Sequence, residues 1–156
     1  FKIIGTPKAG ENKLNLSYAR KLISDFKSLG SNVEYLGFIS NEKVIKILEE
    51  TSILVVPSIW QEPFALTALE GICSGAAVIA SRVGGMSEML DNTGFLIEDI
   101  NEVKLRESID LLLSDEDLLR ELQNKSWQNY NYNQTDIVKK QDTYRKLIMQ
   151  KFNISH

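Results

Sequence analysis

The chain has 156 residues, 43% hydrophobic and 25% charged, which is the composition and length of an ordinary globular protein of one domain. Its 18 Lys and Arg residues against 21 Asp and Glu residues give a net charge of −3, and without a basic stripe a nucleic-acid partner is not expected. Cys73 is the only cysteine and His156 the only histidine, which excludes a disulfide framework, a Cys- or His-ligated metal site and a catalytic triad. We find no signal-peptide pattern and no apolar run of the ~20 residues that a membrane span needs, and expect a reducing, cytoplasmic compartment.

The first third of the chain predicts two strands and two helices. A strand over Phe1–Gly5 is followed by a helix whose apolar residues recur at helical spacing from Ala19 and stop at Gly30. Val33–Leu36 predicts a second strand that ends at Gly37, and Asn41–Glu50 predicts a short helix. Since the chain begins inside a strand without a start methionine, we expect it to be a piece of a longer protein.

The remainder alternates strands with helices. The apolar run Ser52–Pro57 is typical of a strand covered on both faces. The elements predicted after it are a helix from Pro63 to Gly75, a strand over Ala77–Ala80, a short helix over Gly84–Leu90, a strand over Gly94–Ile97, helices from Asn101 with Ser114 as the cap between them, and a helical tail at about 134–152.

This alternation predicts an α/β fold, a Rossmann-like parallel sheet with helices on both faces. In such sheets the ligand binds beyond the carboxyl ends of the strands. Loops 37–40, 58–64 and 81–85 are expected at that edge.

One of those loops leads into a helix whose start can hold an anion. With Pro63 at the first helical position, Glu62 becomes the N-cap residue. The backbone N–H groups of Phe64, Ala65 and Leu66 are then free donors at the positive end of the helix dipole, and they form an anion site without a metal. Thr67 can add its hydroxyl.

Two carboxylates flank this helix start. Glu70 follows Glu62 by eight residues, so their backbones are separated by ~12 Å along a helix. This is too far for a glycosidase pair, whose carboxyl groups lie ~5–9.5 Å apart. The separation suits a ligand with one carboxylate on a hexose, a diphosphate at the helix start and the other carboxylate on a ribose. Acidic residues near a helix start are also favoured by the dipole alone. The buried strand before the motif and the Gly84–Gly85 loop at the same edge favour a binding role.

With these residues the chain resembles the C-terminal, donor-binding half of a family-four retaining glycosyltransferase of the GT-B fold. The resemblance covers roughly residues 1–125. The segments that carry it are, in chain order, Val33–Gly37, Val55–Ser58, Glu62–Glu70, Gly75, Val78–Ala80, Gly84–Gly85, Glu88 and Gly94–Leu96.

The resemblance implies a role for each part of the site. Glu62 would contact hydroxyls of the transferred sugar and stabilise the developing oxocarbenium, and Glu70 would bind the ribose. Backbone amides of Phe64, Ala65 and Leu66, with Thr67, would hold the sugar and diphosphate. The base would lie against the backbone of Gly37, Phe38 and Ile39. Such enzymes use no metal or other cofactor and retain the anomeric configuration, by front-face attack with the leaving phosphate as base.

The chain departs from the family pattern in several places. Ala65 stands where Gly is usual, which would narrow the space beside the sugar, and Gly71 stands where Ala is common. The family's Arg and Lys that neutralise the diphosphate align upstream of Phe1. Lys8 and Lys13 are poor substitutes for them, and Arg82 could face either the cleft or solvent. Trp60 could stack on a sugar or cover the sheet edge.

We therefore expect residues 1–156 to be a single sugar-nucleotide-binding domain, the C-terminal half of a longer enzyme whose acceptor-binding half is absent. The expected reaction transfers a hexose from an NDP-sugar, a UDP-sugar first among them, to a glycan or lipid-linked acceptor. We expect a bacterial surface polysaccharide or lipopolysaccharide pathway, with peripheral contact to the inner face of the membrane. A sugar-nucleotide epimerase of the same architecture and a non-catalytic nucleotide-binding module are the alternatives.

Overall fold

The computed structural model describes residues 1–5, 13–61 and 63–128, together with Thr143 and Lys146. The chain divides into two compact units, Phe1–Ile47 and Leu48–His156, each with its own sheet. Apart from Thr143 and Lys146, which are helical, the predicted tail over 134–152 lies outside the described residues. That residues 1–156 form a single domain stays a prediction.

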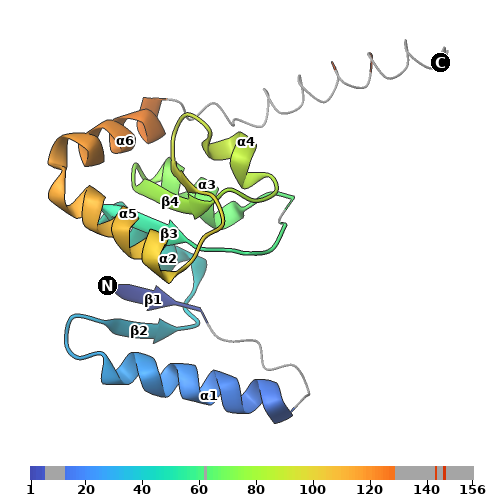
Figure 1. Cartoon of the computed structure of the whole chain (residues 1–156), viewed down its shortest axis with the longest axis vertical. Coiled ribbons are helices and arrows are strands. Elements are labelled where there is room, and N and C mark those ends of the chain that lie inside the picture. Colours follow the sequence, from blue (N-terminus) through green and yellow to red (C-terminus); the bar gives the residue numbers. More distant parts are fainter. Residues whose placement is uncertain (6–12, 62, 129–142, 144–145, 147–156) are drawn as a thin grey trace. The chain divides into compact units, whose positions relative to one another are not determined.

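The first unit is a β–α–β arrangement in which a long helix joins two parallel strands (Figure 1). Its elements are β1 (Lys2–Ile4), α1 (Lys13–Ser28), β2 (Glu34–Gly37) and most of α2 (Asn41–Glu49). α1 packs on β2, where the ring centroids of Phe26 and Tyr35 lie 5.6 Å apart. Gly30, with φ of +83°, follows α1 closely and agrees with its predicted role as a stop signal.

The second unit holds a three-stranded parallel sheet in the order β3–β4–β5. Its further elements are β3 (Ile53–Val56), α3 (Leu66–Cys73), β4 (Ala77–Ser81), α4 (Met86–Leu90), β5 (Phe95–Ile97), α5 (Glu102–Ser114) and α6 (Glu116–Gln128). All five residues of the central strand β4 are buried. The order of strands and helices confirms the predicted α/β class.

Helices cover both faces of this sheet, and neighbouring residues of a strand enter different cores. Val78 of β4 packs in one cluster with Ile72 of α3 and with residues of α4. Ile79 points to the opposite face, where it packs with Leu112 of α5 and Leu122 of α6. Because side chains alternate along a strand, a strand covered on both faces needs a continuous apolar run. This confirms the interpretation of the apolar runs in the sequence.

The described strands form two parallel sheets, β1–β2 and β3–β4–β5, where the sequence predicts one. The hydrophobic pattern of a strand reports which of its faces are covered. It does not specify which distant strand pairs with it, because that pairing depends on contacts between residues far apart in the chain.

The end of α3 explains why a glycine follows it. The N–H of Ala76 donates to the C=O of Gly71 (3.1 Å), and the N–H of Gly75 donates to the C=O of Ile72 (3.0 Å). These two bonds form a Schellman motif, which requires a left-handed residue at Gly75, where φ is +76°. The predicted end of this helix at Gly75 is confirmed.

The cap between α5 and α6 is not the predicted one. Oδ1 of Asp115 accepts a hydrogen bond from the N–H of Leu118 (2.9 Å), whereas the hydroxyl of Ser114 donates to the C=O of Asp110 (2.7 Å). The prediction of Ser114 was wrong because a serine inside a helix can bond to the carbonyl four residues back. The carboxylate one residue later then caps α6.

Candidate functional site

Two loops that follow neighbouring parallel strands form the edge at which the sequence predicts a ligand. β3 pairs with β4 from Ile53↔Ala77 to Val56↔Ala80, so both strands end on the same side of the sheet. In Figure 1 the arrowheads of β3 and β4, which mark these ends, both point to the right of the view. Residues 57–65 lead from β3 into α3 and residues 82–85 lead from β4 into α4, so both helices begin at this edge.

α3 begins three residues later than the sequence predicts. Ala65 is its N-cap residue, with φ of −88° and ψ of 89°, and Leu66 is its first helical residue. Pro63 is therefore not the first helical residue, and Glu62 is not the N-cap. The preference of proline for a first helical position is overridden here by burial, because Ala65 is only 1% exposed and anchors the chain in the core just before the helix.

The later start moves the set of helix-start donors along the chain. The first N–H that bonds within this helix is that of Leu69, which donates to the C=O of Ala65 (3.1 Å). Helix geometry leaves four N–H groups without an intrahelical acceptor, that of the N-cap residue Ala65 and those of Leu66, Thr67 and Ala68 within the helix. Three of the predicted donor residues, Ala65, Leu66 and Thr67, belong to this set.

Phe64 and Ala65 precede the helix. Phe64 is 44% exposed, whereas Ala65 packs in the core cluster with Ala68 and Met86. The methyl group of Ala65 is thus buried in the core, and its effect on the space beside a sugar stays a prediction.

Glu70 lies one turn beyond the start of α3, and its side chain is exposed. Residues three and four apart share a helix face, so Glu70 lies on the same face as Thr67 and Leu66, whose side chains are also exposed. The carboxylate of Glu70 thus lies on the exposed face of α3 that begins at the helix start. Glu62 lies outside the described residues, so its role and its separation of ~12 Å from Glu70 stay predictions.

The three residues predicted to receive the base lie at the end of β2, in the first unit. Gly37 has φ of +64°, and its C=O accepts a hydrogen bond from the N–H of Gly5 (2.9 Å). Phe38 is 83% exposed and Ile39 is half-buried. Since α3 belongs to the second unit, the meeting of both sets around one nucleotide stays a prediction.

Arg82, at the end of β4, is engaged by two carboxylates. Its guanidinium lies 3.7 Å from Asp91 and 3.4 Å from Glu98, and its side chain is 39% exposed. Of the two readings that the sequence leaves open for Arg82, this geometry favours a surface ion-pair network over a cation that faces a diphosphate.

Gln61 connects the two loops of the edge. Its Oε1 accepts a hydrogen bond of 2.9 Å from the N–H of Gly84, which lies 23 residues later in the chain. The sequence carries no signal for this bond, because neither residue type nor spacing links a glutamine to a glycine in another loop.

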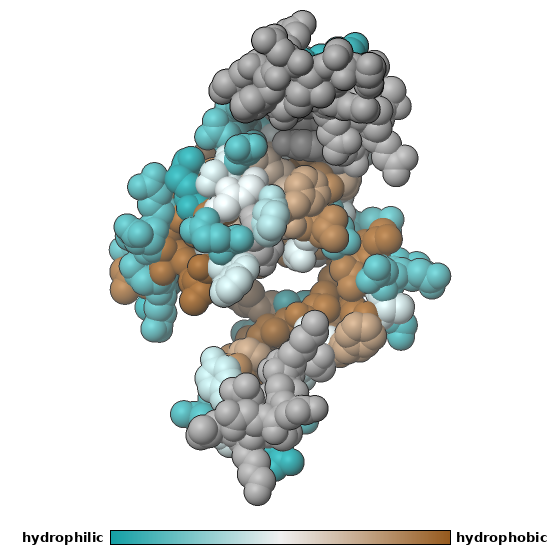
Figure 2. Space-filling view, turned by 90° about the vertical axis from the view of Figure 1, so that its right-hand side faces the viewer, coloured by the Kyte–Doolittle hydropathy of each residue, from teal (hydrophilic) through white to brown (hydrophobic). Residues whose placement is uncertain are grey.

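Apolar side chains are exposed along the loop between β3 and α3 and at the first residue of α3. Their exposed fractions are 83% for Ile59, 74% for Trp60, 44% for Phe64 and 65% for Leu66. Figure 2 faces the side of Figure 1 to which β3 and β4 point and shows brown, hydrophobic side chains among teal ones. Trp60 does not cover the sheet edge, which was one of the two alternatives for it, because a covering side chain would be buried.

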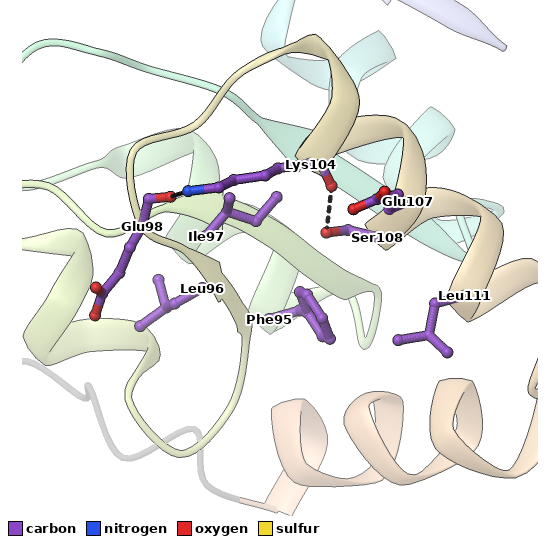
Figure 3. Close-up of a pocket in the computed structure, with 8 residues that line it drawn as sticks. All are labelled: Phe95, Leu96, Ile97, Glu98, Lys104, Glu107, Ser108 and Leu111. Atoms are coloured by element: carbon purple, nitrogen blue, oxygen red, sulfur yellow. Dashed lines mark hydrogen bonds between the residues drawn. The ribbon is translucent and has the colours of Figure 1, made fainter.

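A depression of about 370 Å³ lies elsewhere, between β5 and α5. Figure 3 shows that Lys104 reaches over to the C=O of Glu98 (2.7 Å) and that Ser108 donates to the C=O of Lys104 (2.8 Å). Lys104 and Ser108 thus already bond to protein carbonyls, and the depression does not lie at the carboxyl edge where the loops after β3 and β4 meet. The edge at α3 remains the better candidate.

The described residues show neither a metal-ion site nor a membrane-spanning helix. They contain no group of three His, Cys, Asp or Glu side chains placed to hold a metal ion. Within the same part of the chain, no helix combines the length and the apolar character that crossing a membrane requires.

A parallel sheet between helices, with a helix that begins at its carboxyl edge, defines a Rossmann-like α/β domain. Comparison with known proteins gives the family. Residues 1–133 match the family described as glycosyl transferases group 1, and the chain belongs to this family.

Curated relatives agree with this assignment. The chain is 35% identical over 124 residues to an uncharacterized glycosyltransferase of Methanocaldococcus jannaschii, covering 78% of the chain and 33% of that protein. It is 29% identical over 118 residues to the lipopolysaccharide 1,2-N-acetylglucosaminetransferase of Salmonella typhimurium, covering 74% of the chain and 31% of that protein. The chain thus spans about a third of the length of these relatives.

Solved structures share the fold. Sucrose-phosphate synthase from Thermosynechococcus elongatus superposes with a TM-score of 0.68 at 25% identity, over 96% of this chain and 38% of that one. The C-terminal domain of the group 1 glycosyl transferase LpcC from Francisella tularensis has a TM-score of 0.65 at 25% identity, over 78% of this chain and 67% of that one. Anabaena HepE in complex with UDP-glucose has a TM-score of 0.67 at 22% identity, over 80% of this chain and 34% of that one. These neighbours are GT-B glycosyltransferases, as the resemblance implied.

Proposed function

We propose that the chain is the donor-binding domain of a retaining glycosyltransferase that transfers a hexose from an NDP-sugar, a UDP-sugar first among them, without a metal ion. The observation that carries the proposal is the exposed start of α3 at the carboxyl edge of the sheet, where the N–H groups of Leu66, Thr67 and Ala68 have no acceptor within the helix and the exposed Glu70 follows Leu66 by one turn. Family membership supports it, and so does the fold shared with a protein crystallised with UDP-glucose.

In this proposal the start of α3 binds the diphosphate. Three N–H groups and the positive end of the helix dipole attract the phosphate oxygens. The carboxylate of Glu70 accepts hydrogen bonds from the vicinal hydroxyls of the ribose, because an ionised carboxylate is an acceptor at both oxygens. The backbone of Gly37, Phe38 and Ile39 receives the base.

The chemical step needs few protein groups. The bond between the anomeric carbon and the diphosphate breaks, and the acceptor oxygen forms its bond on the same face of the sugar. The acceptor's proton passes to an oxygen of the departing phosphate, so the products are a glycoside with retained configuration and the NDP. Glu62 contacts the sugar and stabilises the positive charge that develops on its ring.

The acceptor and the pathway belong to the same proposal. The relatives are about three times as long as the segment that matches, and we assign a glycan or lipid-linked acceptor to the rest of such a protein. The lipopolysaccharide transferase among the relatives supports surface polysaccharide or lipopolysaccharide assembly. Such a pathway would place the enzyme in the cytoplasm, in peripheral contact with the inner face of the membrane.

The test is nucleotide binding by calorimetry. Glu70→Ala should lower the affinity for UDP by roughly tenfold or more, because hydrogen bonds to a charged group contribute about 1.5–3 kcal/mol. Glu107→Ala, which removes an exposed glutamate from α5, is the matched control and should leave the affinity unchanged. Equal affinities of the Glu70 and Glu107 variants would refute the ribose role, and absence of any NDP-sugar binding by the wild type would refute the proposed function.

Turnover separates the remaining alternatives. Glu62→Ala should reduce kcat while UDP affinity stays near that of the wild type. An epimerase would instead convert the donor without any acceptor, and a non-catalytic module would bind the nucleotide without turnover in the full-length protein.

A further inference from the structure

We propose that Gln61 is a positioning residue, which fastens the loop after β3 to the glycine turn after β4 and thereby holds the sugar-facing part of the donor site in place. The inference rests on the proposed function, because it assigns Gln61 to that same edge. The inference goes beyond the proposed function because Gln61 lies outside the Glu62–Glu70 motif on which that function is based.

The loop between β3 and α3 is anchored at its two ends and exposed in its middle. Val56, the last residue of β3, is buried in the same core cluster as Ala65, the N-cap residue of α3. Between these anchors Ile59, Trp60 and Gln61 are exposed. The core therefore fixes where the loop begins and ends but not the path of its middle.

The hydrogen bond of Gln61 reaches that middle part. Its Oε1 lies 2.9 Å from the backbone nitrogen of Gly84, in the loop that follows the neighbouring parallel strand. The bond therefore joins two loops at the carboxyl edge of one sheet.

Gly84 is a defined partner for this bond. Its φ of +51° lies in the left-handed region, and its C=O accepts a hydrogen bond from the N–H of Ser87 (3.3 Å) at the start of α4. The bond from Ser87 ties the carbonyl of Gly84 to α4, and the N–H of Gly84 donates to Gln61. The turn after β4 thus offers one oriented donor, and Gln61 is the acceptor that reaches it.

A neutral amide suits this place. Glutamate at position 61 could accept the same hydrogen bond, but its charge would lie at an edge where the proposed ligand carries a diphosphate. Glutamine supplies the acceptor without that repulsion. The tether should act on the position of the transferred sugar more than on UDP affinity, because the donors of Leu66 and Thr67 are fixed by the packing of α3 in the core.

The hydrogen bond is tested with Gln61→Met, which keeps the length of the side chain and removes the acceptor. In ¹⁵N-labelled protein, the amide of Gly84 should shift in the NMR spectrum and exchange faster with solvent. Gln61→Glu keeps an acceptor and should leave the Gly84 amide near its wild-type position. An unchanged Gly84 amide in Gln61→Met would overturn the inference, since the bond would not exist in solution.

Kinetics of the full-length enzyme with UDP-glucose as donor probe the positioning role. Gln61→Met should lower kcat roughly two- to tenfold, the range of one hydrogen bond, while UDP affinity changes less than twofold. Gln61→Glu should recover part of kcat and raise the donor KM. The matched control is Gln123→Met, because the side chain of Gln123 also bonds to a backbone group far away in the chain: its Nε2 donates to the C=O of Ser52 (3.2 Å), just before β3.

The outcomes separate the two proposals. If the Gly84 amide moves but kcat equals that of Gln123→Met, the bond is only structural and the positioning role is overturned. If the wild-type protein binds UDP and only kcat falls in Gln61→Met, both proposals are supported. If the wild type binds no UDP, the proposed function fails and the positioning role fails with it, whatever the Gly84 amide does.

Discussion

At the scale of single residues, Ser126 connects three parts of the second unit. It lies on α6 and is fully buried, and its hydroxyl reaches the C=O of Ala76 (3.1 Å) and the C=O of Thr93 (3.3 Å). Ala76 precedes β4 and Thr93 precedes β5, so one hydroxyl ties α6 to the beginnings of two neighbouring strands.

We expect Ser126→Ala to lower the free energy of unfolding by about 1–3 kcal/mol, because two buried carbonyls lose this donor. Urea unfolding measures the loss. Ser114→Ala is the control, since the hydroxyl of Ser114 bonds to the C=O of Asp110 in an exposed helix turn and its removal should change stability by no more than about 0.5 kcal/mol. Equal losses in both variants would contradict the assignment.

At the scale of elements, the packing of α3 against the sheet depends on a glycine inside the helix. A Cβ at Gly71 would collide with Cδ2 of Leu54 and lie 3.0 Å from Cγ2 of Val78. The lower helix propensity of glycine, about 1 kcal/mol against alanine, is therefore offset by close approach of α3 to β3 and β4. The sequence suggests only the weakened helix.

Gly71→Ala should destabilise the fold by about 1 kcal/mol net, because overpacking costs about 1–3 kcal/mol and the better propensity returns part of it. Thermal or urea unfolding of a double-mutant cycle with Leu54→Val checks the cause. Val lacks the colliding Cδ2 atom, so the penalty of Gly71→Ala should shrink by about 0.5 kcal/mol or more in that background. Strictly additive effects would mean that Leu54 is not the obstacle.

At the scale of the whole molecule, the proposed function predicts that UDP stabilises the protein. A ligand at one hundred times its Kd adds about 2.7 kcal/mol to the free energy of unfolding when it binds only the folded state. The melting temperature should therefore rise with UDP concentration in a thermal unfolding experiment. Free ribose, which carries no phosphate, should have little effect.

The same experiment tests the absence of a metal requirement. Adding a chelator such as EDTA should leave the UDP-dependent rise in melting temperature unchanged. Its loss on chelation, and its return on addition of Mg²⁺ or Mn²⁺, would contradict metal-independent binding.

The sequence by itself determined the order of strands and helices, the α/β class and the end of α3 at Gly75. These features depend on local rules. Apolar runs report coverage of a strand on both faces, and the Schellman motif uses N–H and C=O groups within six consecutive residues, Gly71–Ala76.

Only the tertiary structure decided where α3 begins, what Arg82 contacts and which turn Gln61 holds. Burial of Ala65 in the core moved the start of α3 past Pro63, and two carboxylates from other segments engage Arg82. The bond from Gly84 to Gln61 spans 23 residues. Each of these depends on groups that folding brings together, which neither local propensity nor residue spacing can specify.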